Sequence, residues 1–139
     1  MILVDEWQLI KRIKTKYDYI PWNEFEQTIF TNVDGRPWHY SQLPYQSPLF
    51  VITACCPYSI NIGHQSNYHL HQCLRQHLDS RFPLASIEEI IGRSADGQWQ
   101  ELSWAVTGID KHQALAMGRM FHQWAIFSFD QGERSVLRC

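Results

Sequence analysis

The apolar run LFVITACC, at residues 49–56, constrains the fold more than any other segment of this chain. It is continuous rather than alternating and is rich in residues that favour strands. Such a run is typical of an interior strand that is covered on both faces. Leu70, Leu74 and Leu78 then recur on one face of a helix predicted over residues 66–79. We therefore expect layers of structure built around a central strand.

Downstream of this helix the sequence predicts a hairpin, a second helix and another strand, over residues 86–93 with 99–107, 110–122 and 124–129. The hairpin turns at Asp96-Gly97, and Asp110 with Gln113 matches the capping box that opens a helix. The element order is therefore β-α-β-β-α-β. This order is typical of a ferredoxin-like α+β fold, whose mostly antiparallel sheet has strand order 4-1-3-2 and carries both helices on one face.

Smaller elements flank this core. We predict a helix over residues 4–16, a strand over 26–33, a loop over 36–48 and a short final strand over 134–138. The chain has 139 residues, 45% of them hydrophobic, which suits one domain with its own core and is too short for two ordinary domains. We expect a single domain, 1–139, in which residues 1–44 form an N-terminal extension that covers an edge or the open face of the sheet.

The charge balance limits the classes of partner. Twelve Lys and Arg residues are dispersed among fourteen Asp and Glu, whereas a phosphate backbone requires clustered basic residues. Trp99 and Trp104 offer rings on which bases can stack, but Trp104 shares a strand face with Leu102 and Val106 and is interpreted as core. We expect no nucleic acid partner. The expected partner is therefore a small molecule or another protein, and the chain could be a monomer or a homodimer.

Cysteine usage and hydropathy favour a cytoplasmic location. Cys55 and Cys56 are adjacent, and together with Cys73 and Cys139 they form no CxxC pair. The first seven residues carry two acidic side chains where a signal peptide carries basic ones, and no apolar run approaches 18 residues. We expect four free thiols in a reducing compartment and no membrane association.

Three motifs occur in a fixed order: VITACCPYS at residues 51–59, NYHLHQCLRQHL at 67–78, and WQELSWAVTGID with ALAMGRMFHQWAIF at 99–127. Together they resemble a bacterial family catalogued as domain of unknown function 3293, whose pattern contains TAWNP.S, a helix with two asparagines, and a closing W.E.S segment. The resemblance covers about residues 45–130. It implies positions of interest but no chemistry, because that family has no established activity.

The resemblance implies a set of polar positions, which in this chain are Thr53, Pro57, Asn67, Glu101 and Gln123. The chain departs from the family pattern at two places. Cys56 replaces the asparagine before the proline, and His71 replaces the second asparagine of the helix. A role that requires those amides is therefore not carried over.

A row of soft-metal ligands lies on the first predicted helix. His69, Cys73 and His77 are spaced i, i+4 and i+8, so they share one face. Three ligands in a row along a helix cannot all reach one ion, and a closed site would need others, such as His64 or His71. We interpret Cys73 as a core residue instead, since buried free cysteine is common. We expect no bound metal and no cofactor.

The adjacent thiols raise the question of covalent catalysis. Cys55 or Cys56 could be a nucleophile with His64 or His71 as its base, but strand alternation would point the two thiols to opposite faces. We interpret one of them as a core residue and the other as merely a small residue. Glu101 has no second carboxylate at a suitable spacing, and Gly-rich phosphate loops, GxSxG and HExxH are absent. No motif therefore identifies an enzyme class.

The predicted sheet brings several polar positions toward one end. The end of strand 49–56 would lie beside the starts of the strands at 99–107 and 124–129, and the first helix begins at the same end. We expect a ligand site there, built from Thr53, Cys56, Asn67, His71, Glu101, Arg119 and Gln123. Alternation places Glu101 on the face away from the helices. Two half-sites, or a Glu101 that binds backbone amides of the N-terminal segment, therefore stay open.

The most economical interpretation is a small cytoplasmic binding or regulatory domain that recognises a small molecule or a protein. The alternative is an enzyme that uses the polar positions at the end of the sheet. A deep pocket that holds Glu101 or His71 favours the enzyme, whereas a flat aromatic patch favours the binding domain.

Overall fold

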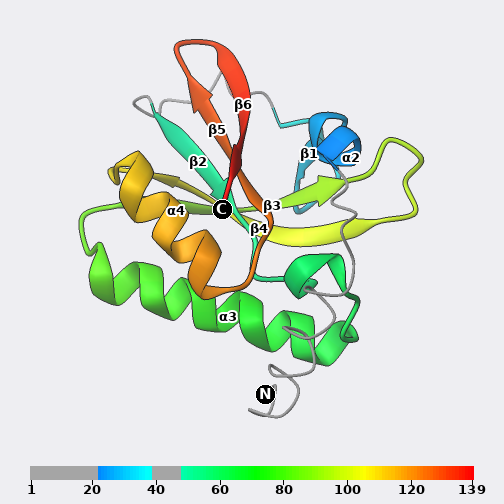
Figure 1. Ribbon diagram of the computed structural model, residues 1–139, viewed down its shortest axis with the longest axis horizontal. Helices are drawn as coiled ribbons and strands as arrows, with labels where there is room; N and C mark the ends of the chain where they lie inside the picture. Colours follow the sequence, from blue (N-terminus) through cyan, green and yellow to red (C-terminus); the bar gives the residue numbers. More distant parts are fainter. Residues whose placement is uncertain (1–21, 39–47) are drawn as a thin grey trace.

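The computed structural model describes residues 22–38 and 48–139, so the helix expected over residues 4–16 lies outside the described residues. The elements, in chain order, are α2 (Trp22–Glu26), β1 (Ile29–Asn32), β2 (Leu49–Ile52), the 3-10 helix η2 (Pro57–Ser59), α3 (His64–Arg81), β3 (Ser86–Arg93), β4 (Gln100–Thr107), α4 (Lys111–Met120), β5 (Ala125–Asp130) and β6 (Glu133–Arg138). They form an α+β fold with one six-stranded sheet (Figure 1).

The strand order across the sheet is β1-β3-β4-β2-β5-β6, and each neighbouring pair is antiparallel. β2 lies in the interior, between β4 and β5, as its continuous apolar run predicts. The sheet differs from the four-stranded ferredoxin-like sheet expected from the sequence. β1 is added beside β3 at one edge, and β6 is added beside β5 at the other.

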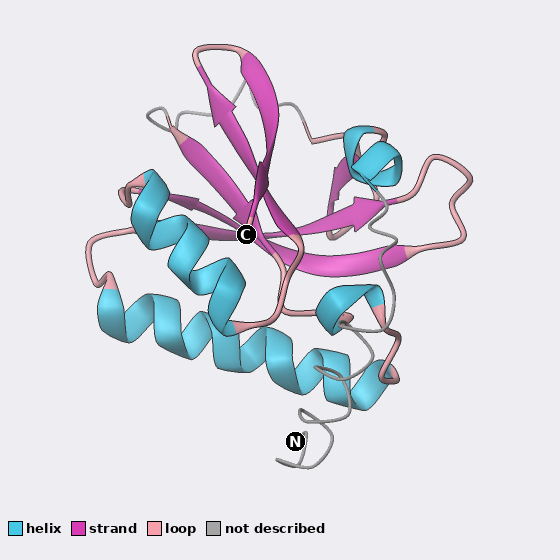
Figure 2. Cartoon of the chain, viewed as in Figure 1, coloured by secondary structure: helices cyan, strands magenta, loops and turns pink. Residues whose placement is uncertain are grey.

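Both long helices, α3 and α4, pack on one face of the sheet, as expected from the right-handed crossovers (Figure 2). Leu74 and Leu78 of α3 and Met117 of α4 are fully buried in the same cluster as Phe50 and Ile52 of β2. The two helices therefore pack on the sheet through their apolar stripes. No helix among residues 22–38 and 48–139 has the length and apolar character needed to cross a membrane.

Two local motifs anticipated from the sequence are present. The Asp110 side chain accepts a hydrogen bond from the Gln113 backbone N–H, and the Gln113 side chain accepts one from the Asp110 N–H, so the capping box opens α4. The hairpin of β3 and β4 pairs Ser86 with Thr107 and Arg93 with Gln100.

The strand expected over residues 49–56 ends at Ile52, four residues early. The Thr53 hydroxyl donates to the Leu102 carbonyl at 2.8 Å and accepts the Cys55 backbone N–H at 3.0 Å. These bonds turn the chain out of the sheet, since a threonine side chain can replace ladder partners of the backbone. Cys55 and Cys56 therefore do not alternate across a strand, and both thiols are buried.

The strand expected over residues 26–33 is also shorter, because β1 begins at Ile29. The preceding residues, Trp22–Glu26, form the short helix α2. Five residues are too few to show helical periodicity in a sequence. α2 was therefore missed.

The second face of the sheet is concave. Phe30 of β1 contacts Phe127 and Phe129 of β5, with ring centroids 4.9 and 5.8 Å apart, although β3, β4 and β2 separate these strands in the sheet. Trp38 extends the cluster, with its ring 5.3 Å from that of Phe129. The sheet therefore curls until its β1 edge faces β5, and it forms a second small core on this side.

We predict that Gly118→Ala lowers the free energy of unfolding by about 1–2 kcal/mol. A Cβ at this position of α4 would lie 2.7 Å from both Ile126 Cγ2 and Cys139 Sγ, and Ile126 is fully buried. Overpacking of this kind costs about 1–3 kcal/mol, which outweighs the gain of up to about 1 kcal/mol in helix propensity. Urea unfolding measures the change. Ala116→Ser, on the exposed side of the same helix, is the control, and unchanged stability of Gly118→Ala would contradict the argument.

Candidate functional site

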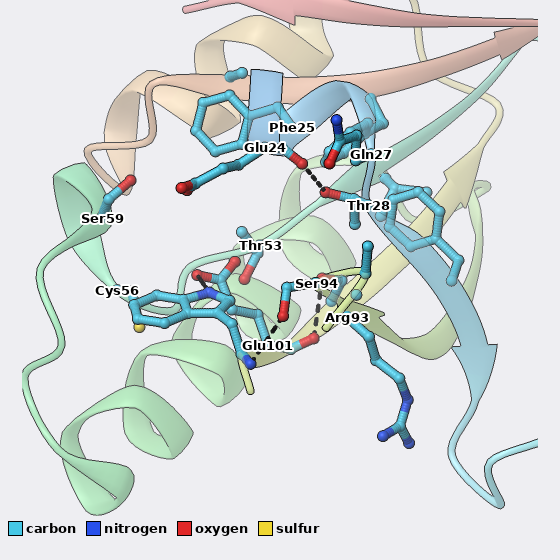
Figure 3. Close-up of a pocket in the computed structure, with 18 of the residues that line it drawn as sticks. Glu24, Phe25, Gln27, Thr28, Thr53, Cys56, Ser59, Arg93, Ser94 and Glu101 are labelled. Carbon is cyan, nitrogen blue, oxygen red and sulfur yellow. Dashed lines mark hydrogen bonds between the residues drawn. The ribbon is translucent and has the colours of Figure 1, made fainter. Parts of the chain in front are cut away.

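A cavity of about 640 Å³ opens on the concave face of the sheet. Its volume lies within the range of small-molecule sites. Figure 3 shows Glu24 and Phe25, on α2, across the cavity from Thr53, Cys56 and Glu101. The cavity is therefore a product of the curl, which brings α2 and β1 over the ends of β4 and β5.

Strand alternation explains why β4 contributes polar groups to this cavity. Glu101 and Ser103 line it, whereas Trp104 belongs to the core beneath α3. Gly92 of β3 is the direct partner of Glu101 in the sheet, and a Cβ on Gly92 would lie 3.4 Å from the ring of Phe30. The missing side chain at Gly92 thus leaves room beside the carboxyl group.

Glu101 is the chemically distinctive group of the cavity. The indole Nε1 of Trp99 donates to its Oε1 at 2.9 Å, and the thiol of Cys56 hydrogen-bonds to the same carboxyl. Burial raises the pKa of Glu101 from an ordinary value of 4.5 to about 7, and these two hydrogen bonds oppose the rise without cancelling it. At neutral pH both the protonated and the ionised form of Glu101 are therefore populated.

The two neighbouring thiols are not activated. Burial, followed by the charge of Glu101, raises the pKa of Cys55 to about 12, and the same two causes raise the pKa of Cys56. A thiol in this state is protonated at physiological pH and is a poor nucleophile. The structure buries both cysteines, whereas only one was expected in the core, and Cys56 is in addition a hydrogen-bond donor to Glu101.

The turn that carries Cys56 is held in a strained conformation. Cys56, Tyr58 and Ser59 have φ angles of 50°, 50° and 63°, in the left-handed region that residues other than glycine rarely adopt. Asn67 of α3 holds the turn, because its Oδ1 accepts the Cys56 backbone N–H at 2.8 Å. On the other side the Tyr58 N–H donates to the carbonyl of His122 at 2.8 Å. Strained turns of this kind occur often at functional sites.

Gln123 lines the cavity but serves mainly to fix its wall. Its Nε2 donates to the carbonyls of Cys55, at 3.0 Å, and Phe121, at 3.2 Å. Both hydrogens of the side-chain amide are thereby engaged. Gln123 thus ties the end of α4 to the turn after β2.

The structure separates two of the expected site residues from the others. His71 is fully buried on the helical face, where its Nε2 lies 2.7 Å from Glu89 Oε2 and its ring stacks on Trp104 at a centroid distance of 4.2 Å. Burial lowers the pKa of His71. Arg119 is exposed in the last turn of α4 and does not line the cavity. Thr53, Cys56, Glu101 and Gln123 do line it, and Asn67 supports it through Cys56.

The soft-metal row on α3 is likewise outside the cavity. Cys73 Sγ lies 3.4 Å from His69 Nε2, and His77 packs its ring against Phe121. Within the described part of the chain, no three potential ligands are grouped around one point.

Several cavity residues were missed by the sequence analysis. Glu24, Phe25 and Phe30 come from the extension that was expected only to cover the sheet, and Phe127 comes from a strand of the expected core. Gly92 could have been found, because the hairpin register around Asp96-Gly97 pairs it with Glu101. The α2 residues carry no comparable signal.

We predict that the contribution of Glu101 to the stability of the protein falls as pH rises from about 4.5 to about 7. The pKa of Glu101 is higher in the folded protein than in the unfolded chain, so its contribution is fully present below pH 4.5 and is lost as the pH rises through about 7. The loss is on the order of 3 kcal/mol. Urea unfolding of the wild type and of Glu101→Gln at pH 5 and pH 8 isolates this group from others, such as His71. A constant difference between the two proteins would contradict the assignment.

Comparison with known proteins gives a family but no function. A family model described as a protein of unknown function (DUF3293) matches residues 52–126, more than half of the chain. No curated protein and no solved structure matches the chain. The matched segment contains Thr53, Cys56, Asn67, Glu101 and Gln123, which form or support one wall of the cavity. The chain belongs to this family of proteins of unknown function, DUF3293.

Proposed function

We propose that the chain binds a small molecule in the cavity on the concave face of its sheet, with Glu101 as the polar anchor. The observation that carries this proposal is the position of Glu101, a carboxyl group with a pKa of about 7, in the wall of a cavity of about 640 Å³. Ionisable groups with perturbed pKa values concentrate at functional sites, and ligand sites combine apolar walls with few polar groups.

A purely structural role explains Glu101 less well. Its hydrogen-bond partners are the Trp99 indole and the Cys56 thiol, and both of these residues themselves line the cavity. Glu101 is half-buried and joins no ion pair within the described part of the chain, so its ionisation lowers the stability of the fold. A glutamine would accept the Trp99 hydrogen bond without that cost. The presence of an acid at this position is therefore better explained by a ligand.

The same carboxyl supports a second candidate function, proton transfer to or from a bound substrate. A pKa near the working pH is what a general acid or base requires. The protonated thiols of Cys55 and Cys56 offer no nucleophile to accompany it. Binding is therefore the better supported function, because catalysis would depend on Glu101 without a thiolate from Cys55 or Cys56 beside it.

We predict that fragment-sized ligands bind in this cavity. Protein-observed NMR on the full chain with a fragment library should give hits that shift the amides of Thr53, Gly92 and Ser103 together, because these residues line one space. Gly92→Val fills the space beside Phe30 and should weaken every such hit at least about tenfold, while Asp79→Asn, an exposed change on α3, should leave affinities unchanged.

Two outcomes would overturn the proposed function. One is a screen in which no hit shifts the cavity amides. The other is a set of hits that bind Gly92→Val as tightly as the wild type, once circular dichroism shows that the variant is folded.

A further inference from the structure

We propose that the ligand of this cavity is an organic cation, a protonated amine or amidine attached to a flat apolar body. This inference rests on the proposed function and names the chemical class of its ligand. It is carried by the hydrogen-bonding capacity, the charges and the ring faces that the cavity presents.

Three polar side chains that line the cavity use their donor hydrogens within the protein. The Thr53 hydroxyl donates to the Leu102 carbonyl, and the Ser94 hydroxyl donates to Asp96 at 2.6 Å. Gln123 uses its amide hydrogens on two backbone carbonyls. These three groups therefore offer a ligand no further N–H or O–H donor.

Acceptor capacity remains on the carboxylates. An ionised carboxylate has about four lone-pair sites, and Glu101 receives donors from Trp99 and Cys56. Glu24, on the opposite wall, contributes a second, exposed carboxylate at the mouth of the cavity. The cavity thus offers acceptors, which suits a ligand that carries N–H donors.

Among residues 22–38 and 48–139, no basic side chain forms an ion pair with the ionised form of Glu101. Arg93 lines the cavity, but its Nε donates to the Thr31 hydroxyl at 3.0 Å, and Figure 3 shows its guanidinium turned away from Glu101. Arg134 donates instead to the carbonyl of Phe25 at 3.1 Å. In the described part of the chain no ion pair includes Glu101. A cationic ligand would supply the missing charge.

The remaining ionisable groups around the cavity do not supply a positive charge to pair with Glu101. Asp96 is negative and accepts hydrogen bonds within its own turn, from Ser94 and the Gln98 N–H. Cys56 is a neutral thiol, because burial raises its pKa. Glu24 and Asp96 offset the positive charges of Arg93 and Arg134, so the ionised form of Glu101 leaves the cavity with a net negative charge that disfavours an anion.

Aromatic rings complete the match to a cation. Phe25, Phe30, Phe127 and Trp99 line the cavity, and ring faces attract cations within about 6 Å. This attraction is already used within the protein, where the Arg134 guanidinium lies 5.2 Å from the ring centroids of both Phe30 and Phe127. A flat ligand body can pack on the rings while its charged end reaches Glu101.

Three matched probes test the ligand class: 2-phenylethylamine, 2-phenylethanol and phenylacetate, titrated into the full chain by NMR at pH 5, 6 and 7. The amine should bind more tightly than either analogue and shift the amides of Thr53, Gly92 and Ser103. As the pH rises, its affinity should increase roughly tenfold from pH 5 to pH 6 and roughly fivefold from pH 6 to pH 7, because the competent, ionised fraction of Glu101 rises in that proportion. Glu101→Gln should abolish the pH dependence and weaken the amine at least about tenfold, whereas Asp79→Asn should change neither.

The outcomes separate this inference from the proposed function. If the alcohol or the acid binds at the same amides as tightly as the amine, or if amine affinity falls as pH rises, the cation is wrong and cavity binding stands. If none of the three probes shifts the cavity amides although other fragments do, the cation is again wrong. If no fragment of any class shifts them, the proposed function fails as well.

Discussion

The packing of Phe30 against Phe127 and Phe129 is the contact on which the cavity depends. It joins β1 to β5, across three intervening strands, and so converts an open sheet into a curled one. Edge-to-face aromatic pairs contribute roughly 0.5–1.5 kcal/mol each beyond their buried area. Together with the hydrogen bond from Arg134 to the Phe25 carbonyl, these contacts hold α2 across the cavity from Glu101. The site is therefore as stable as the closure of the sheet, and a ligand that touches both walls would stabilise that closure.

The turn after β2 is the second feature that shapes the cavity, and its left-handed backbone places the Cys56 thiol beside Glu101. Asparagine tolerates the left-handed conformation better than most residues, and the family pattern has asparagine at the position of Cys56. Here Cys56 adopts φ 50° and presents its thiol to Glu101. Asn67 and Gln123 hold this turn from opposite sides. The polar positions of the motif thus act together, some of them on the cavity and others on the turn that shapes it.

Local patterns were sufficient to predict much of this fold. Periodicity located α3 and α4, the Asp96-Gly97 turn fixed the β3–β4 hairpin, and alternation placed Glu101 on the face away from the helices. The curl could not be predicted in this way, since it depends on contacts such as Phe30 with Phe127, which lie far apart in the chain. His71 was grouped with the site because it stands in place of the second helix asparagine and lies near the start of the first helix. It follows Leu70 directly on α3, however, and it belongs to the buried side of that helix.

The stability contributions of the two faces of the sheet depend on pH in opposite directions. On the helical face, burial lowers the pKa of His71 below its ordinary value of 6.5, so protonation of the unfolded chain costs stability as the pH falls below about 6.5. On the concave face, the raised pKa of Glu101 costs stability as the pH rises toward 7. The fold on its own therefore loses stability at high pH through Glu101 and at low pH through His71. A cation beside Glu101 would remove the first cost and leave the second, so it would move the pH of greatest stability upward. The ionised carboxylate of Glu101 lowers the stability of the fold on its own, and the same carboxylate would form the ion pair with a cationic ligand.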